Sequence, residues 1–206
     1  NTGGMGAYSP APVITPAVHD KIMQNIITPT VQGLVSEGIP YIGFLYAGLM
    51  MDNRGEPRLL EYNCRLGDPE TQPILMRMQS DLIDLCMAAM EHRLDKCKVS
   101  WDPRPSMGVV MAAGGYPGDY RKGDMISGLP QSRDDLKVFH SGTRQKDKQF
   151  LTNGGRVLCV TAIGDTVLKA QLKAYGEVRR IHWPDAFYRT DIGYRAVARE
   201  SVASAS

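Results

Sequence analysis

Residues 59–73 read LLEYNCRLGDPETQP and form the most informative stretch of this 206-residue sequence. Side chains alternate along an extended strand, so Glu61 and Asn63 would point to the same face, roughly 6.6 Å apart along the backbone. A carboxylate and an amide oxygen on one face suit Mg²⁺, which accepts few protein oxygens and completes its coordination with water and phosphate. The same spacing also fits two polar residues on the solvent face of a hairpin.

The residues after this pair are mostly polar, although they lie between an apolar strand and an apolar helix. Arg65 offers a planar fork of donors to phosphate or carboxylate oxygens, and Gly67 lets the backbone approach a ligand closely. Asp68 and Glu70 add carboxylates that suit an ammonium group. Each residue alone is ordinary turn chemistry. Together they form a dense patch of opposite charges, which favours a binding site.

Composition excludes several classes of protein. The hydrophobic fraction of 43% and the charged fraction of 22% are typical of globular chains. A formal charge of +2 offers no large field for nucleic acid. The longest apolar run, at 42–51, is far shorter than the roughly 20 residues that span a bilayer. We therefore expect neither a nucleic-acid partner nor a membrane.

The four cysteines are widely spaced and form no CxxC pair, so they indicate neither zinc binding nor redox work. We expect free, buried thiols in a reducing cytoplasm. The residues concerned are Cys64, Cys86, Cys97 and Cys159.

The first predicted helix covers residues 15–37. Thr15 suits the N-cap and Pro16 suits the first helical position, where its missing N–H costs nothing. Pro29 should kink or briefly interrupt the helix, and Gly38 is a plausible stop.

A hairpin is predicted next, with residues 39–51 as one strand, DNRG as the turn and residues 56–63 as the returning strand. Residues 64–73 are expected to form a loop. Ser80 would then cap a helix that runs to about Leu94.

A domain boundary is predicted within residues 97–105, CKVSWDPRP, because this segment has two prolines and no hydrophobic period. Short strands broken by glycine-rich turns follow it. A helix is expected at about 166–180, capped by Asp165.

The first six residues, NTGGMG, contain three glycines but no GKS or GKT, so they are not a Walker A loop. They fit a tight turn packed against the core. They fit equally a loop whose backbone amides, at Gly3, Gly4 and Gly6, face a reacting phosphate.

The chain closely resembles the glycinamide ribonucleotide synthetase family of ATP-grasp ligases in residues 59–73, in NTGGMGAYSPAP ahead of them and in GFLYAGLM between. The resemblance continues through VVMAAGGYPGDYRKGD, VFHSGT, TNGGRVLCVTAIGDTV and DIGYRA, and so covers about residues 1–200. It implies an α+β fold. Residues 1–96 would be the back half of an ATP-grasp domain that binds nucleotide and Mg²⁺, and residues 97–206 a small β-rich C-terminal domain.

The resemblance also implies a reaction. The family uses ATP to join glycine to 5-phosphoribosylamine through glycyl phosphate. The products are glycinamide ribonucleotide, ADP and phosphate, an early step of cytoplasmic purine biosynthesis. Such a reaction brings anions together, so catalysis depends on positioning and on charge neutralisation.

Three residues match the family's metal and catalytic positions. The resemblance implies that Glu61 and Asn63 hold Mg²⁺ or Mn²⁺ and that Arg65 stabilises charge on the transferring phosphoryl group. Many ATP-grasp ligases place a third carboxylate on the preceding strand. Here that strand has no acid, and Asp52 lies in the turn beyond it.

Further residues are implied as contacts to ATP and substrates. Gly3, Gly4 and Asn63 would lie near the nucleotide, and Asp68 and Glu70 near the substrates. The partners would be small molecules, namely glycine, phosphoribosylamine and ATP.

Family members are much longer than this chain. The resemblance implies that an N-terminal α/β domain and the front half of the ATP-grasp domain belong to the same enzyme, so this missing half is an expected partner. Two other interpretations stay open. The chain is a stable fragment that folds or binds without catalysis, or it is part of an ATP-grasp ligase for a different acid and amine.

Overall fold

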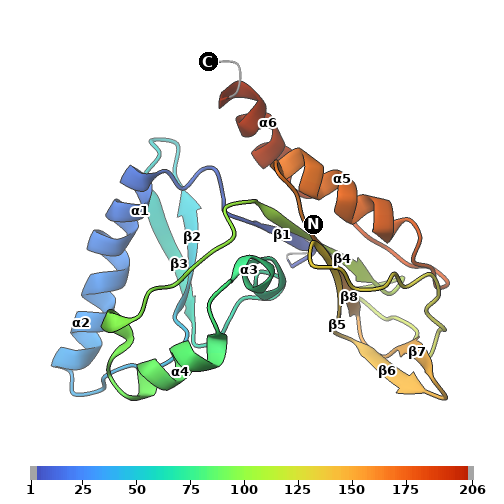
Figure 1. Cartoon of the computed structure of the whole chain (residues 1–206), viewed down its shortest axis with the longest axis horizontal. Coiled ribbons are helices and arrows are strands. Elements are labelled where there is room, and N and C mark those ends of the chain that lie inside the picture. Colours follow the sequence, from blue (N-terminus) through green and yellow to red (C-terminus); the bar gives the residue numbers. More distant parts are fainter. Residues whose placement is uncertain (1–3, 204–206) are drawn as a thin grey trace. The chain divides into compact units, whose positions relative to one another are not determined.

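Helices and strands both contribute to the fold, and the computed structural model describes residues 4–203 (Figure 1). The chain divides into two units, each assembled from separate segments. The first unit takes the residues up to 10, residues 68–78 and the residues from 102 on, and the second takes residues 11–67 and 79–101. The predicted α+β class is confirmed. The predicted domain limits at residues 96 and 97 stay a prediction.

An antiparallel four-stranded sheet forms the centre of the first unit. The two middle strands are almost entirely buried, because helices cover both faces of the sheet. In spatial order the strands are β1 (Gly6–Ser9), β4 (Ser106–Ala112), β8 (Arg156–Ile163) and β5 (Leu136–His140).

Helix α5 (Val167–Val178) covers one face of this sheet. Val109 and Met111 of β4 pack in one buried cluster with Ala174 and Val178 of the helix. Because side chains alternate along β4, its other face receives Gly108 and Val110. In Figure 1, α5 runs alongside the strands of the first unit and leads into α6 (Tyr194–Ala203).

Helix α3 (Thr71–Arg77) covers the opposite face and contacts β1, β4 and β8. A Cβ added at Gly108 would lie 3.2 Å from Pro73 Cγ and 3.0 Å from Cys159 Sγ, so this glycine makes room for the helix. Ser106 Oγ, fully buried, donates to the carbonyl of Pro73 at 2.6 Å. The sheet therefore anchors the helix at its first turn.

The prediction of a loop over residues 64–73 is wrong from Thr71 onward, where α3 begins. Pro73 falls in the first turn, where a missing N–H removes no intrahelical hydrogen bond. Arg77 fixes the other end of α3 by donating to Ser9 Oγ at 2.9 Å and to the carbonyl of Asp102 at 3.1 Å. Only the first three residues of α3, up to Pro73, lie in the predicted loop, and packing against the sheet holds them in the helix.

The first unit also contains a hairpin, and the N-cap of α5 differs from the prediction. Strands β6 (Thr143–Lys146) and β7 (Gln149–Thr152) pair antiparallel, and the predicted Asn-Gly turn leads from β7 into β8. Thr166, rather than Asp165, caps α5, because its Oγ1 accepts the N–H of Lys169 at 3.1 Å. The Asp165 carboxylate instead accepts from the Lys169 ammonium group at 2.8 Å.

The second unit opens with a helix in three parts, α1 (Pro16–Ile22), a π-helical stretch (Met23–Ile27) and α2 (Thr28–Ser36). Thr15 caps it as predicted, accepting the N–H of Val18 at 3.3 Å. The predicted interruption is confirmed but lies before Pro29, because a widened turn relieves the clash between a proline ring and the carbonyl four residues earlier. Gly38 follows the helix with a φ of 76°, as expected of a stop.

The predicted hairpin is present as β2 (Tyr46–Met51) and β3 (Pro57–Asn63). The first strand begins at Tyr46 rather than at residue 39. Helix α4 (Leu82–Met90) follows, and it ends before Leu94, which begins a short 3₁₀ turn.

The predicted cap of α4 is wrong. Asp81 caps this helix, because its Oδ1 accepts from Ile83 N at 2.7 Å and from Asp84 N at 3.3 Å. Ser80 Oγ instead accepts the N–H of Ser100 at 2.7 Å.

All four cysteines are free, as predicted, but their burial differs from the prediction. Cys159 is buried, Cys86 and Cys97 are half-buried, and Cys64 is exposed. Every helix among residues 4–203 is too short or too polar to cross a membrane.

The docking of α3 yields a stability prediction. Gly108→Val should lower the free energy of unfolding of the first unit by about 1–3 kcal/mol, because the added methyl groups meet Pro73 and Cys159. Urea unfolding followed by fluorescence, to which buried Trp183 contributes, measures the change. Gly33→Ala, in α2 of the second unit with nothing within 4 Å, is the control and should leave the unfolding midpoint of the first unit unchanged. An unchanged midpoint for Gly108→Val would contradict the packing.

The cysteines yield a chemical prediction. Burial raises the pKa of the Cys159 thiol to about 12, so at pH 8 almost no thiolate forms. Exposed Cys64 should react with a thiol reagent in the native chain, and Cys159 only after unfolding. Peptide mass spectrometry after labelling identifies the modified residues. Modification of Cys159 in the native chain would contradict the prediction. Cys64→Ser should abolish the rapid labelling that we expect of the native chain.

Candidate functional site

The strand β3 brings Glu61 and Asn63 together in the second unit. Asn63 Nδ2 donates to Glu61 Oε1 at 3.2 Å, so the two side chains share one face as predicted. Tyr62 points the other way, and its hydroxyl lies 2.6 Å from Thr30 Oγ1 on the helix. The hydroxyl also contacts the carbonyl of Ile26 at 3.3 Å.

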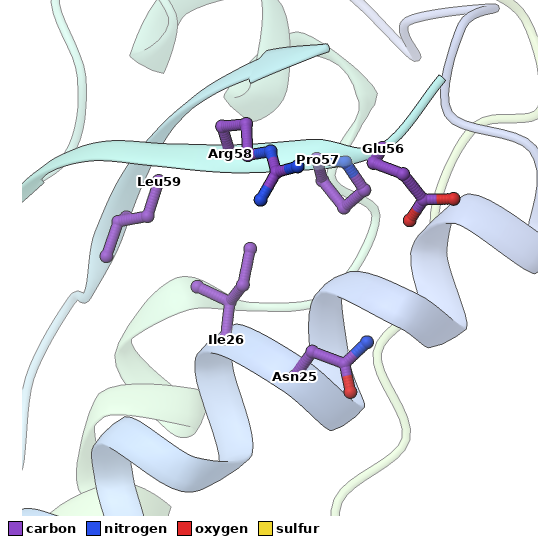
Figure 2. A pocket seen from close by; sticks show the side chains of 6 residues that line it. All are labelled: Asn25, Ile26, Glu56, Pro57, Arg58 and Leu59. Atoms are coloured by element: carbon purple, nitrogen blue, oxygen red, sulfur yellow. The ribbon is translucent and has the colours of Figure 1, made fainter. Parts of the chain in front are cut away.

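An extra residue in β3 sets these directions. Gly48 pairs with Glu61 and Leu49 pairs with Leu59, which leaves Leu60 as a bulge. Leu59 and Ile26 face each other across a pocket of about 340 Å³ between β3 and the helix (Figure 2). Leu59 and Tyr62 are three positions apart yet both face the helix, and in a regular strand they would not. The bulge therefore turns Glu61 and Asn63 away from the helix.

Figure 2 also shows the polar rim of this pocket. Glu56 lies at one end of β3 and Asn25 on the facing helix. Lys21 donates to the Glu56 carboxylate at 2.5 Å, which ties α1 to the strand. The pocket thus lies on the helix side of β3, whereas Glu61 and Asn63 lie on the other.

The partner strand leaves space for Glu61. A Cβ added at Gly48 would lie 2.9 Å from Glu61 Cγ, so the carboxylate side chain crosses over a position that has no side chain. Glu61 is exposed. Within residues 4–203, Glu61 Oε2 and Asn63 Oδ1 have no hydrogen-bond partner. Two hard oxygens held over a glycine fit a small divalent cation that takes its remaining ligands from water and phosphate.

Larger metal clusters are absent from the part of the chain that the structure describes, where no three His, Cys, Asp or Glu side chains come together. Asp52 does not supply a further ligand. Its carboxylate accepts the N–H groups of Glu56 and Arg54, both at 2.9 Å, and so closes the hairpin turn. These two hydrogen bonds lower the pKa of Asp52 below its usual value.

Arg65 follows the pair on an exposed loop. Its Nη1 donates to the carbonyl of Leu66 at 2.9 Å, so the guanidinium is folded back on its own loop. This placement leaves Arg65 accessible, and its predicted role in phosphoryl transfer stays a prediction.

A second group of predicted residues lies in the first unit, around Arg156. Arg156 Nη2 donates to Asp68 Oδ2 at 2.8 Å, and Nη1 donates to the Asp68 carbonyl at 2.9 Å. Nη1 also donates to the carbonyl of Gly4 at 3.2 Å. The structure thus brings Gly4 and Asp68 together through one guanidinium. Gly3, the other glycine predicted to lie near the nucleotide, falls outside the described residues.

Glu70 lies at the start of α3. Its carbonyl accepts the N–H of Ile74 at 3.2 Å, and its side chain does not cap the helix. Pro69, between Glu70 and Asp68, is buried against the first unit. The docking of α3 therefore fixes where Asp68 and Glu70 lie within the first unit.

The residues near Asp68 include an apolar cluster that contains Cys159. Cys159 of β8 packs in a cluster with Met5, Val110 and Ala112. Burial raises the pKa of Cys159, the nearby Asp68 charge raises it further, and the hydrogen bond with Thr161 opposes the rise. This thiol is packing material and not a nucleophile.

Sequence reasoning missed two residues, Gly48 and Arg156. Gly48 is one of several glycines in an apolar strand, and only the register of the hairpin places it under Glu61. Arg156 is separated from Asp68 by 88 positions, so no local pattern links them. Its place at the start of a strand after an Asn-Gly turn is the one signal that the sequence offers.

Two family models match the chain. The model described as "Phosphoribosylglycinamide synthetase, ATP-grasp (A) domain" matches residues 1–71. The model described as "Phosphoribosylglycinamide synthetase, C domain" matches residues 106–195.

Curated relatives are similar over nearly the whole chain. A phosphoribosylamine–glycine ligase of Vibrio parahaemolyticus is 62% identical over 201 residues, which are 97% of this chain and 47% of the relative. Proteins of the same name from Allochromatium vinosum and Escherichia coli O157:H7 are 63% and 62% identical, again over 97% of this chain and 47% of each relative. The chain thus spans about half the length of these relatives.

Solved structures show the same fold. The phosphoribosylamine–glycine ligase of Thermotoga maritima superposes with a TM-score of 0.80 at 36% identity, covering 93% of this chain and 46% of that one. The biotin carboxylase domain of Hydrogenobacter thermophilus 2-oxoglutarate carboxylase, solved with MgADP, gives a TM-score of 0.62 at 13% identity over 89% of this chain and 40% of that one. The second likeness shows the fold alone. With both family models and the high identity in agreement, the chain belongs to the phosphoribosylglycinamide synthetase family.

Proposed function

We propose that the chain is part of an enzyme that ligates glycine to 5-phosphoribosylamine with ATP, giving glycinamide ribonucleotide, ADP and phosphate. The observation that carries the proposal is the pairing of Glu61 with Asn63 at 3.2 Å on the open face of β3, in a chain whose relatives are named as this ligase. The enzyme would act in the cytoplasm, where free thiols such as that of Cys64 persist.

Glu61 and Asn63 are the proposed ligands of Mg²⁺ or Mn²⁺. When bound, the cation neutralises charge on the phosphate oxygens of ATP. Gly48 would keep the Glu61 carboxylate over the open face of the hairpin, and the bulge at Leu60 would keep it turned away from the helix. These features support the proposal because the hydrogen bond between Asn63 and Glu61 already holds the two side chains side by side, which lowers the ordering cost of binding.

The remaining residues act on the reacting groups. The carboxylate of glycine attacks the γ-phosphorus of ATP, which forms glycyl phosphate and releases ADP. The amine of phosphoribosylamine then attacks the acyl carbon, loses a proton and displaces phosphate. Arg65 would stabilise the charge of the transferring phosphoryl group. Asp68 and Glu70 would hold the ammonium group of glycine.

The opening loop is proposed to lie near the nucleotide. Gly3 and Gly4 would present backbone N–H groups rather than side chains to ATP. For Gly4 the structure adds a second reason for glycine, the close approach of Arg156. The two roles are compatible, since the contact to Arg156 uses the carbonyl of Gly4.

The missing half of the enzyme is the proposed partner of the second unit. That unit exposes many large apolar side chains, which suit contact with another part of the enzyme. Leu60 is 64% exposed and Met90 is 70% exposed. Others exposed in this unit are Val35, Ile39, Ile42, Met50, Ile83 and Met87. Without that half, we expect the chain to fold but not to catalyse.

An assay of ADP release tests the proposed function. The full-length enzyme that carries this chain should release ADP only when ATP, glycine and phosphoribosylamine are all present. The 206-residue chain alone should release none, since it spans about half of the ligase relatives. Replacing glycine by other amino acids is the control for substrate class. Turnover with another amino acid but not with glycine would point to a different ATP-grasp ligase.

Substitution of the metal ligand tests the site. Glu61→Ala in the full-length enzyme should lower kcat by orders of magnitude without unfolding it, because an exposed ligand is removed. Gly48→Val should act in the same direction by displacing the Glu61 side chain. Steady-state kinetics and circular dichroism measure the two effects.

Glu56→Ala is the matched control for Glu61→Ala, because Glu56 lies on the same hairpin but pairs with Lys21. It should leave turnover unchanged. Near-normal turnover of Glu61→Ala would mean that the metal site lies elsewhere.

A further inference from the structure

Arg156 opens strand β8, and a second bulge sets the direction of its side chain. Met111 pairs with Leu158 and Ala112 pairs with Arg156, which leaves Val157 as the extra residue. In a regular strand Arg156 would share a face with Leu158 and Val160, both fully buried in the core. The bulge instead sends Val157 into that core and turns Arg156 to the face of Cys159.

The guanidinium then joins two segments that are distant in sequence. It donates to the carbonyl of Gly4, 152 positions away, and to both the carbonyl and the carboxylate of Asp68, 88 positions away. A planar fork with several N–H groups can hold these acceptors at once, whereas an ammonium group is a point charge on a flexible stem. Arg156 therefore holds the Asp68 side chain and the backbone at Gly4 in one arrangement.

Gly4 is shaped to this contact. Its φ is 74°, and a Cβ there would lie 2.4 Å from Arg156 Nη1 and 3.4 Å from the Asp68 carbonyl. A side chain at this position would push the guanidinium away. The absence of a Cβ, the bulge and the hydrogen bonds are separate observations, and all three place Arg156 against Gly4 and Asp68.

The contact remains open to ligands. The Arg156 side chain is 27% exposed and that of Asp68 is 49% exposed. Among the described residues, Arg156 Nε–H has no hydrogen-bond partner. By contrast, Arg77 donates to the hydroxyl of Ser9 and to the carbonyl of Asp102, neither of which is a predicted site residue. A buried structural arginine has no need of an exposed carboxylate as its partner.

We propose that Arg156 is a positioning residue of the ligase, which holds the Asp68 carboxylate and the Gly4 loop in the arrangement that receives glycine. The proposal rests on the proposed function, in which Asp68 holds the ammonium group of glycine. Arg156 acts through Asp68 and does not itself need to touch the substrate. Loss of the Arg156 side chain should therefore weaken the binding of glycine, whereas the binding of ATP should change little.

The kinetic test uses the full-length enzyme. Arg156→Ala should raise the KM for glycine about tenfold or more, because a charge-assisted pair is lost, while the KM for ATP stays within about twofold. Arg156→Lys should rescue part of the loss. Arg121→Ala is the matched control, since the exposed Arg121 forms an ion pair with Asp124 in the same unit. Its glycine KM should equal that of wild type.

A double-mutant cycle with Asp68→Asn makes the test specific. If Arg156 acts through Asp68, the double variant should bind glycine no worse than Asp68→Asn alone. An unchanged glycine KM in Arg156→Ala, or losses that multiply in the double variant, would overturn the proposal. An equal rise in the KM for glycine and for ATP would also overturn it, since that is the result of general loosening.

Hydrogen exchange separates this inference from the proposed function. Arg156→Ala should speed amide exchange in the peptides that contain Gly4 and Asp68, relative to Arg121→Ala. Suppose that the wild-type enzyme fails to use glycine while Arg156→Ala still speeds this exchange. In that case the proposed ligase function is wrong, but the contacts of Arg156 with Gly4 and Asp68 are supported. If Arg156→Ala leaves the exchange unchanged, Arg156 does not hold Gly4 and Asp68 in place, whatever the enzyme ligates.

Discussion

The first unit depends on the docking of α3 against the bare backbone of Gly108. Glycine inside a strand costs conformational entropy, and at this position it is offset by the approach of Pro73. The buried hydroxyl of Ser106 then finds its hydrogen-bond partner in the carbonyl of Pro73. Because Asp68 lies three residues before Thr71, where α3 begins, the same contact determines where the Asp68 carboxylate lies in the first unit.

A bulge in β3 and a bulge in β8 each redirect functional side chains. In a regular strand every second side chain faces the core, so a polar side chain at such a position would be buried. In β3 the extra residue Leu60 frees Glu61 and Asn63 from this alternation, and in β8 the extra residue Val157 frees Arg156. Bulges are over-represented next to functional sites because they redirect a side chain without disturbing the rest of the ladder.

Local signals in the sequence predicted the features that depend on local physics. Thr15 and Gly38 bound the first helix as capping rules require, and the hairpin follows its turn. Glu61 and Asn63 share a face because two positions on the same side of the bulge keep the period of a strand. The caps of α4 and α5 were each misplaced by one residue, since Ser, Thr and Asp all serve as caps and neighbouring candidates compete.

Non-local features were beyond the reach of the sequence. Helix α3 follows directly on a turn-rich segment, and its start at Thr71 depends on packing against the sheet. Neither bulge has a marker in the chain, since each is defined by pairing with another strand. Arg156 could not be connected to Asp68 for the same reason, and this contact adds Arg156 to the predicted residues of the first unit.

The order of segments in the first unit has a consequence for how the protein folds. Its sheet takes an edge strand from before residue 10, a covering helix from residues 68–78 and its two central strands from after residue 105. During synthesis, β1 and α3 are made before β4, and well before β8. Contacts of such high sequence separation form slowly, because the entropy of loop closure precedes the gain from burial. The early segments must wait with their apolar faces uncovered until β8 has been made, which gives chaperones a defined interval in which to act.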